Sequence, residues 1–191
     1  MKGMNNMHKC SKPYPCPYFF NIQMYNMYNM MCFQNFLNQT ALLTDEINDD
    51  DLIELKDYGP EPYVVNIDEA TKQNNNFRTA LWTGDNLQVT LMSIPVGEDI
   101  GLETHPKVDQ FIRIEEGNGL VKIGDRKNKL DFQEKIYDDY AIMIPAGKWH
   151  NIINTGDKPL KLYSIYAPPE HPRGTVHETK EIAEAAEEKY K

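Results

Sequence analysis

Between residues 60 and 170 the chain consists of short apolar runs that are separated by turn sequences. The sequences GDN, GED, EEGNG, GDRKN and NTGDKP carry the glycine, asparagine and aspartate residues of tight antiparallel connections. Many short strands at regular spacing predict a sandwich or barrel, not a series of strand–helix–strand units. The runs that we expect to form strands are Tyr63–Ile67, Phe77–Thr83, Leu87–Ile94, Gln110–Glu115, Gly119–Ile123, Tyr140–Ile144, His150–Asn154 and Leu160–Tyr166. The chain is therefore predicted to be all-β, with a single antiparallel β-barrel over residues 61–170.

Two segments flank the predicted barrel. Residues 45–60 form an acidic connection, in which Leu52, Ile53 and Leu55 predict a short helical stretch that ends at Gly59. Residues 171–191 form an extension that ends in a helix, because Thr175 and Glu178 have the spacing of a capping box and Ala, Glu and Lys follow them. The apolar stripe of this helix is thin, so we expect a solvated helix without a catalytic role. Its members are Ile182, Ala186 and Tyr190.

The charge and hydropathy of the chain argue against two classes of protein. The 191 residues include 20 Lys and Arg against 29 Asp and Glu, which gives a net charge of −9. A nucleic-acid-binding protein would show a basic face. A membrane span needs about 18 consecutive apolar residues, and no run approaches that length. We therefore expect a small-molecule partner, neither nucleic acid nor membrane, and a cytoplasmic location.

Residues 1–44 differ from the rest of the chain in composition. They hold three lysines, no acidic residue, seven of the nine methionines and all three cysteines. Such a polar–aromatic segment is expected to be disordered alone and to self-associate readily. Cys10, Cys16 and Cys32 can crosslink chains through this tail. Together with His8 they can also supply four zinc ligands, although their spacings match no common zinc finger.

The polar residues that indicate chemistry lie in two segments of the predicted barrel. Residues two apart on a strand face the same side, so Glu103 and His105 can both point into the barrel. Gln110 begins the next strand, and His150 follows the turn at Pro145–Gly147. Asp109 neighbours Gln110 and therefore faces the opposite side.

The two segments resemble the paired motifs of the cupin superfamily. The first motif, G-x5-H-x-H-x4-E-x6-G, has the spacing of Gly97, Glu103, His105, Gln110 and Gly117. The second motif, G-x5-P-x-G-x2-H-x3-N, is matched from Asp139 through Pro145, Gly147 and His150 to Asn154. The resemblance covers about residues 63–168 and implies a jelly-roll barrel. Asp139 replaces a glycine, and this change concerns the turn and not the metal.

The resemblance also implies one divalent metal ion, held by Glu103, His105, Gln110 and His150. Glu103 replaces the first histidine of the motif and Gln110 replaces its glutamate, so the net charge of the ligand set is unchanged. The oxygen-rich set favours Mn²⁺, Fe²⁺ or Zn²⁺. The alternative is that Glu103 and Gln110 bind a ligand without metal.

Other polar and aromatic residues receive weaker predictions. Trp149 is expected to face outward, because it neighbours His150 on a strand. One of Tyr163 and Tyr166 is expected to line the pocket, since they lie on opposite faces of the last strand. His171 is expected in a surface loop, with the alternative that it folds across the barrel mouth.

Three functions follow from these residues. The first is an enzyme that resembles the barrel of type-I mannose-6-phosphate isomerases and acts on a sugar-type substrate. In that chemistry a metal ion holds the substrate oxygens, and Glu103 is the natural catalytic base if it is not a ligand. The second is an Fe²⁺-dependent cupin dioxygenase, which an all-apolar pocket would favour. The third is a non-enzymatic ligand-binding or spore-coat protein, because the tail resembles the low-complexity ends of coat proteins. We also expect a homodimer, since the sheet edges of small barrels are commonly covered.

Overall fold

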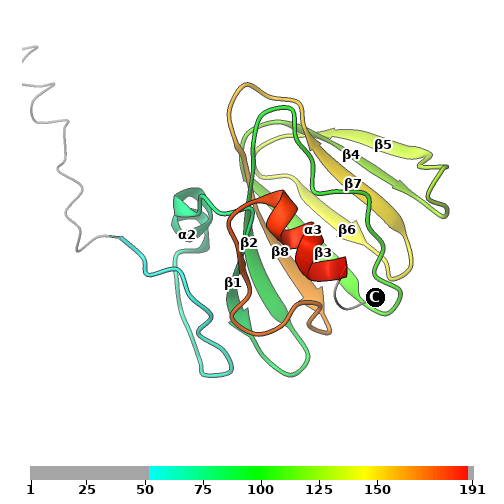
Figure 1. The fold of residues 1–191 in the computed structure, drawn as a ribbon. Coiled ribbons are helices and arrows are strands. Elements are labelled where there is room, and N and C mark those ends of the chain that lie inside the picture. Colours follow the sequence, from blue (N-terminus) through cyan, green and yellow to red (C-terminus); the bar gives the residue numbers. More distant parts are fainter. Residues whose placement is uncertain (1–51, 189–191) are drawn as a thin grey trace, which may run out of the picture. The chain divides into compact units, whose positions relative to one another are not determined.

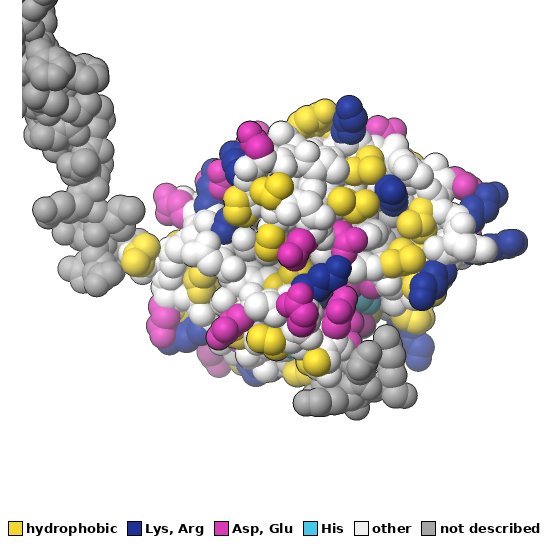
Figure 2. Space-filling view, turned by 45° about the horizontal axis from the view of Figure 1, so that its top comes forward, with side chains coloured by type: hydrophobic (Ala, Val, Ile, Leu, Met, Phe, Trp, Pro, Cys, Tyr) yellow, Lys and Arg dark blue, Asp and Glu magenta, His cyan; other side chains and the backbone are white. Residues whose placement is uncertain are grey.

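The structure is a computed structural model that describes residues 52–188. The predictions for residues 1–44, which concern disorder, crosslinking through Cys10, Cys16 and Cys32, and a zinc site, lie outside the described residues. Among the described residues, neither helix is long and apolar enough to cross a membrane. Figure 2 shows acidic and basic side chains scattered together over one face of the protein.

Two antiparallel sheets form the barrel (Figure 1). The larger sheet has six strands, in the order β6 (Ala141–Ile144), β3 (Asp109–Glu116), β8 (Leu160–Ala167), β2 (Gln88–Ile94), β1 (Arg78–Thr83) and β9 (Val176–His177). The smaller sheet has the order β5 (Phe132–Ile136), β4 (Gly119–Gly124) and β7 (Trp149–Asn154). The prediction of an all-β jelly-roll barrel followed by a C-terminal helix is confirmed.

The main core lies between the two sheets, where alternate residues of each strand meet. Ile112 and Ile114 of β3 and Ile152 of β7 are each at most 1% exposed, as their inward positions require. The other core residues come from every part of the barrel, namely Phe77, Met92, Ile94, Ile100, Val121, Ile136, Ile142, Ile144, Leu160, Leu162 and Ala183. The core therefore joins both sheets and the C-terminal helix.

The strand predicted at Tyr63–Ile67 is wrong. Residues 63–66 form no strand, and Ile67 begins helix α2 (Ile67–Gln73), whose N-cap is Asn66. The alternation in this segment is real, because Tyr63 and Val65 are half-buried while Val64 is 95% exposed. The side chains of Tyr63 and Val65 pack with Leu81 in a second core cluster, while the backbone of this segment joins no sheet.

The short helical stretch predicted at residues 52–55 is also wrong. The backbone of Ile53 is bonded instead to the side chain of Gln73, which donates to the Ile53 carbonyl and accepts from its N–H. Ile53 and Leu55 pack on the second core cluster. The Gln73 side chain therefore satisfies the N–H and the carbonyl of Ile53, which a helical turn would have paired with other backbone groups.

Strand β5 was missed because its sequence, FQEKI, has no apolar alternation. Only Ile136 is buried, and the other four residues are exposed at the edge of the smaller sheet. Charged and polar residues are common on edge strands, where they discourage pairing with other chains. Strand β9 has only two residues and was also missed.

The C-terminal helix α3 (Lys180–Glu188) differs from the prediction in its start and in the residue that contacts the core. Thr179, and not Thr175, lies at its N-terminus, where the Thr179 hydroxyl accepts a bond from the Ile182 N–H. Most of the helix is exposed or partly exposed, as predicted, but Ala183 is 2% exposed and belongs to the main core. The helix therefore contacts the core through Ala183, which is not part of the predicted apolar stripe, while Ile182 of that stripe is 46% exposed.

The turn before β6 requires a left-handed backbone at Asp139, whose φ is 69°. Glycine adopts this conformation most easily, and aspartate tolerates it better than most residues. The Asp139 carboxylate also accepts a hydrogen bond from Arg113 of β3. Asp139, which replaces the motif glycine, therefore takes the turn conformation of that glycine, as predicted.

Candidate metal site

Glu103 and His150 are brought together by a pair of backbone hydrogen bonds. The Glu103 N–H donates to the His150 carbonyl at 3.1 Å, and the His150 N–H donates to the Glu103 carbonyl at 2.9 Å. Residues that exchange both bonds across antiparallel segments are directly opposite, and their side chains share one face. The two predicted site residues, 47 positions apart in the chain, therefore point to the same place.

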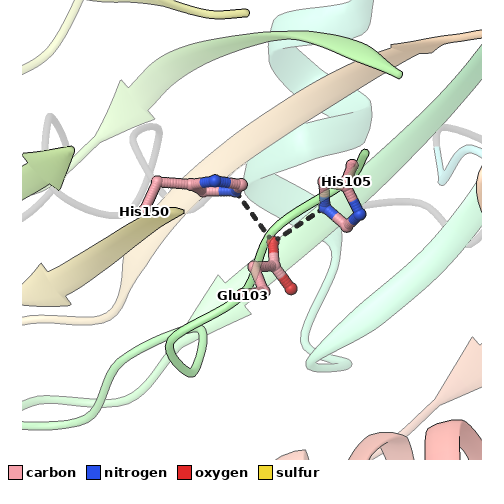
Figure 3. Close-up of side chains that lie close together, drawn as sticks. All are labelled: Glu103, His105 and His150. Carbon is pink, nitrogen blue, oxygen red and sulfur yellow. Dashed lines mark hydrogen bonds and ion pairs between the residues drawn. The ribbon is translucent and has the colours of Figure 1, made fainter. Parts of the chain in front are cut away.

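His105 completes the cluster from two residues along the same segment. Its Nε2 lies 3.3 Å from Glu103 Oε1, and His150 Nε2 lies 3.2 Å from that same oxygen (Figure 3). The potential ligand atoms of the three residues all lie within 4.8 Å of one another. His150 is fully buried and His105 is 7% exposed. The structure thus gathers three of the four predicted ligands around one point.

The other nitrogen of each ring is also bound by an acceptor. His105 Nδ1 lies 3.0 Å from Glu170 Oε1, and His150 Nδ1 lies 3.1 Å from the Lys148 carbonyl oxygen. Acceptors of this kind behind a metal-binding imidazole fix the orientation of the ring and the tautomer. The orientation leaves Nε2 of both histidines directed at Glu103.

The neighbouring charges and hydrogen bonds shift the pKa values of His105 and Glu103. Burial disfavours the charged form of His105, but the bonds to Glu103 and Glu170 outweigh it and raise the pKa of His105 to about 9. Burial likewise disfavours the Glu103 carboxylate, yet the bonds from His105 and His150 and the charge of Arg78 hold the pKa of Glu103 well below its usual range. Glu103 is therefore ionised in the folded protein.

Gln110, the fourth predicted ligand, is 4% exposed and lies on β3 opposite Tyr166 of β8. Its side-chain amide donates to the Ser164 hydroxyl at 2.9 Å. Its carbonyl oxygen Oε1 is buried without a hydrogen-bond partner among the described residues. This oxygen is thus free to act as a neutral donor. Asp109 is exposed and accepts a bond from the Ala146 N–H instead, as its outward position predicts.

The cluster opens into a cavity of about 870 Å³. The walls combine polar and apolar surface and come from five separate parts of the chain. The lining residues are Leu102, Glu103, Thr104, His105, Lys127, Trp149, Glu170, His171, Pro172, Thr175, His177, Ala186 and Glu187. Helix α3 therefore contributes to the cavity that contains the candidate site.

Two predictions about the surroundings of the site are wrong. Trp149 lines the cavity, with Lys127 Nζ 5.8 Å from its ring centre, instead of facing away from it. His171 also lines the cavity, because Gln88 holds its backbone N–H and carbonyl on the barrel. Burial and the charge of Arg78 lower the pKa of His171 to about 2, so its ring is neutral.

Tyr166 is the tyrosine that faces inward. It is fully buried, with its ring centre 5.6 Å from that of His105 and 5.1 Å from that of His171. Burial raises the pKa of Tyr166 to about 12, so the hydroxyl keeps its proton. Tyr163 lies on the other face, against Phe111.

Glu170 and Arg78 are parts of the site that the sequence analysis missed. Glu170 belongs to neither motif, and Arg78 lies inside an apolar run that predicts only a strand. The one signal for Arg78 is a charge within the segment FRTALWT, which is otherwise typical of a buried strand. Spacing along the chain does not connect either residue to His105.

Comparison with known proteins agrees with this architecture. A family model described as "Cupin domain" matches residues 90–166, which include all four predicted ligands. The protein YrkC of Bacillus subtilis is 58% identical over 178 residues, and the match covers 91% of this chain and 95% of YrkC. The protein L612 of Acanthamoeba polyphaga mimivirus is 44% identical over 115 residues, with 60% of this chain and 70% of L612 covered.

A solved structure is also similar to this chain. The crystal structure of BH2720 from Bacillus halodurans is 70% identical, with a TM-score of 0.68, and the match covers 68% of this chain and 98% of BH2720. The match to YrkC covers 91% of this chain. Residues 52–191 are a smaller share of the chain than that, so the match also includes part of residues 1–51.

Proposed function

The chain belongs to the cupin superfamily, and we propose that it binds one divalent metal ion and acts on a small, oxygen-rich, sugar-type substrate. Glu103, His105 and His150 would hold the ion. The observation that carries this proposal is the convergence of both Nε2 atoms on Glu103 Oε1, while acceptors hold both Nδ1 atoms. Without a metal, each Nε2 needs a proton to contact the carboxylate, and a cation can replace those protons.

Gln110 fits as a fourth, neutral ligand because its buried Oε1 has no other partner in the described part of the chain. Two imidazoles, one carboxylate and one amide oxygen suit Mn²⁺, Fe²⁺ or Zn²⁺. When bound, such an ion polarises carbonyl and hydroxyl oxygens as a Lewis acid. The low pKa of Glu103 supports a role as ligand over a role as general base, since a base works best with a pKa near the working pH.

The polar groups on the cavity walls support a sugar-type substrate over the substrate of a dioxygenase. The walls carry carboxylates, imidazoles and hydroxyls, which can bond to sugar hydroxyls, beside apolar surface, whereas an all-apolar lining would favour oxygen chemistry. Two arginines that could otherwise bind a phosphate group are engaged elsewhere. Arg113 binds Asp139, and Arg173 donates to the carbonyls of Gly59 and Thr83. We therefore favour a substrate without a phosphate group.

Exchange of substrate hydrogen with solvent tests this function. Protein loaded with Mn²⁺ or Zn²⁺ is incubated in D₂O with D-mannose or D-fructose, and deuterium at the carbon next to the carbonyl is followed by NMR. We expect exchange that stops with chelator and returns with metal. Oxygen uptake that requires Fe²⁺, without exchange, would favour the dioxygenase. A metal-loaded protein that does neither would contradict the proposed enzyme activity.

Removal of the carboxylate behind His105 should weaken metal binding. Glu170→Gln keeps the size of the side chain but no longer accepts the His105 Nδ1 proton as a charged group. Losses of such partners typically lower metal affinity about 10- to 100-fold. Competition with a chromogenic chelator measures the change. Glu178→Gln, on an exposed residue outside the cavity, is the matched control and should bind metal normally.

Metal affinity should rise with pH. His105 has a pKa of about 9 and so holds an extra proton near neutral pH, which the metal must displace. Below that pKa, affinity is expected to rise about tenfold per pH unit for each proton released. Calorimetric titration with Mn²⁺ in two buffers of different ionisation enthalpy measures the released protons. A heat that does not depend on the buffer would contradict this prediction.

The homodimer stays a prediction that sedimentation equilibrium can test. Its support is a group of exposed apolar residues, Phe132, Tyr140 and Met143, around a cavity of about 650 Å³. Strands β5 and β6, which carry Phe132 and Met143, are edges of their sheets. A second copy that covered this surface would protect both edges.

A further inference from the structure

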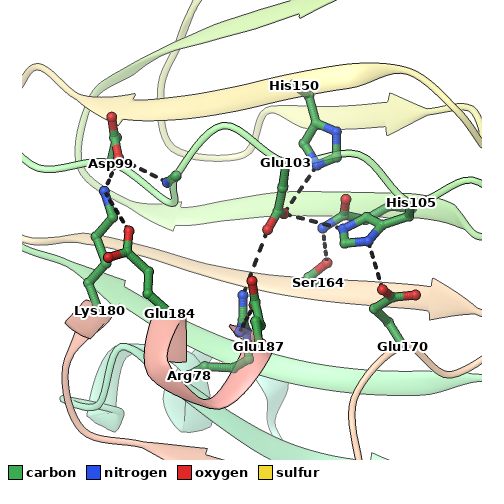
Figure 4. A network of polar contacts seen from close by, with 12 residues as sticks. Arg78, Asp99, Glu103, His105, His150, Ser164, Glu170, Lys180, Glu184 and Glu187 are labelled. Carbon is green, nitrogen blue, oxygen red and sulfur yellow. Dashed lines mark hydrogen bonds and ion pairs between the residues drawn. The ribbon is translucent and has the colours of Figure 1, made fainter. Parts of the chain in front are cut away.

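Arg78 is a buried cation beside the candidate metal site. It lies on β1 and is 1% exposed. Its Nη1 lies 3.2 Å from Glu187 Oε1, and its Nη2 lies 4.0 Å from Glu103 Oε2 (Figure 4). Its Nε is buried without a hydrogen-bond partner among the described residues. The guanidinium is therefore placed between the metal cluster and the end of helix α3.

The hydrogen-bonding capacity of Arg78 is mostly unused. A guanidinium has five N–H donors in a planar fork, and only the contact with Glu187 is within hydrogen-bond distance of an anion. Burial of a charged group is costly unless the group is paired and bonded. Glu187 is itself a weak partner, because its side chain is 42% exposed on the cavity wall. The guanidinium therefore keeps donors that a better acceptor could use in place of Glu187.

Other buried polar atoms around the cavity also have no partner within residues 52–188. They are Gln110 Oε1, Tyr166 Oη, His171 Nε2 and His177 Nδ1. Tyr166 packs against both His105 and His171, and His177 pairs with Arg78 across β1 and β9. Polar atoms without partners are rare in folded proteins, and their gathering at one cavity indicates a polar ligand.

We propose that Arg78 is the receptor for a carboxylate of the substrate, and that Glu187 occupies this receptor in the absence of substrate. The inference rests on the proposed function, because it narrows the sugar-type substrate to a small sugar acid or hydroxy acid. The carboxylate of the ligand binds Arg78, while its hydroxyl oxygens lie toward Glu103, His105 and His150. Glu187 then leaves the fork and turns to solvent, to which it is already partly exposed.

A carboxylate fits this receptor better than a larger anion. The group that now contacts Arg78 is itself a carboxylate, that of Glu187. Arginine binds such planar groups through two parallel hydrogen bonds. The fork also lies only 4.0 Å from Glu103 Oε2, so the acidic and hydroxyl ends of the ligand must be close together. These features point to a short acid, in which the carboxylate is near the hydroxyls.

Binding of a matched pair of sugars tests the proposal. D-Glucuronate and D-glucose differ chiefly in one carboxylate, and their affinities are measured by calorimetry on the full chain, with Mn²⁺ and after chelation. We expect glucuronate to bind at least about tenfold more tightly than glucose. Arg78→Met should remove this preference, and Arg78→Lys should restore only part of it, since lysine lacks the fork.

Variants of helix α3 test the role of Glu187 without changing a buried residue. Glu187→Ala removes the competing carboxylate and should tighten glucuronate binding about three- to tenfold, with no effect on glucose. Glu184→Ala is the matched control, because Glu184 lies one turn earlier, is 62% exposed and, within residues 52–188, pairs with Lys180 and not with Arg78. It should leave both affinities unchanged.

The outcomes separate this inference from the proposed function. Equal binding of glucuronate and glucose by protein that holds metal would overturn the carboxylate receptor and leave the metal site intact. A preference for glucuronate that depends on Arg78 in protein without metal would support the receptor and contradict the metal site. Binding of inorganic phosphate that depends on Arg78, without binding of glucuronate, would also overturn the receptor.

Discussion

A variant that combines Glu103→Ala and His150→Ala is expected to purify without divalent metal, whereas the unchanged chain carries about one equivalent of Mn, Fe or Zn. The two substitutions remove the only carboxylate of the described cluster and one of its two imidazoles. Loss of a hydrogen-bond acceptor that orients a metal ligand already lowers the metal affinity about 10- to 100-fold, so loss of two ligands should lower it further. Inductively coupled plasma mass spectrometry on protein purified without chelators measures the metal.

The control for this experiment is His177→Ala. It removes an imidazole that lines the same cavity but does not belong to the cluster, so it should keep its metal. Circular dichroism of both variants checks that the barrel is folded. Metal retained by the double variant, or absent from the unchanged protein, would argue against the site. Glu103 and Gln110 would then be ligand-binding residues without metal.

Leu162→Ala should be the most destabilising simple truncation in the barrel. Leu162 is fully buried on β8, which pairs with both β2 and β3 in the middle of the larger sheet. Truncation of a buried leucine leaves a cavity and typically costs about 2–5 kcal/mol. Domains are stable by about 5–15 kcal/mol, so this change removes a large share of the free energy of unfolding. Urea denaturation followed by fluorescence measures the loss.

Leu87→Ala is the matched control, because Leu87 is 38% exposed in the turn before β2. The same side chain is removed there, but much of it already contacts water, so we expect a loss below about 1 kcal/mol. Equal losses at the two positions would contradict the core described here.

The agreement between sequence and structure is best where local spacing decides the structure. Alternate residues of a strand face opposite sides, so Ile112, Ile114 and Ile152 are placed inward by their position alone, and all three are buried. Asp139 has the left-handed backbone expected at a turn glycine of the motif. Where local signals were ambiguous the prediction failed, as at Tyr63–Ile67, where alternating residues pack on a sheet without joining it.

The amino-acid sequence alone predicted the barrel, the resemblance to cupins and the residues Glu103, His105 and His150, which the structure brings together. It did so because strand alternation and motif spacing are short-range properties of the chain. The positions of Arg78, Glu170 and Glu187 around this cluster follow only from the folded chain. These residues come from β1, from the segment after β8 and from helix α3. No sequence motif links them, because long-range packing determines which distant side chains meet.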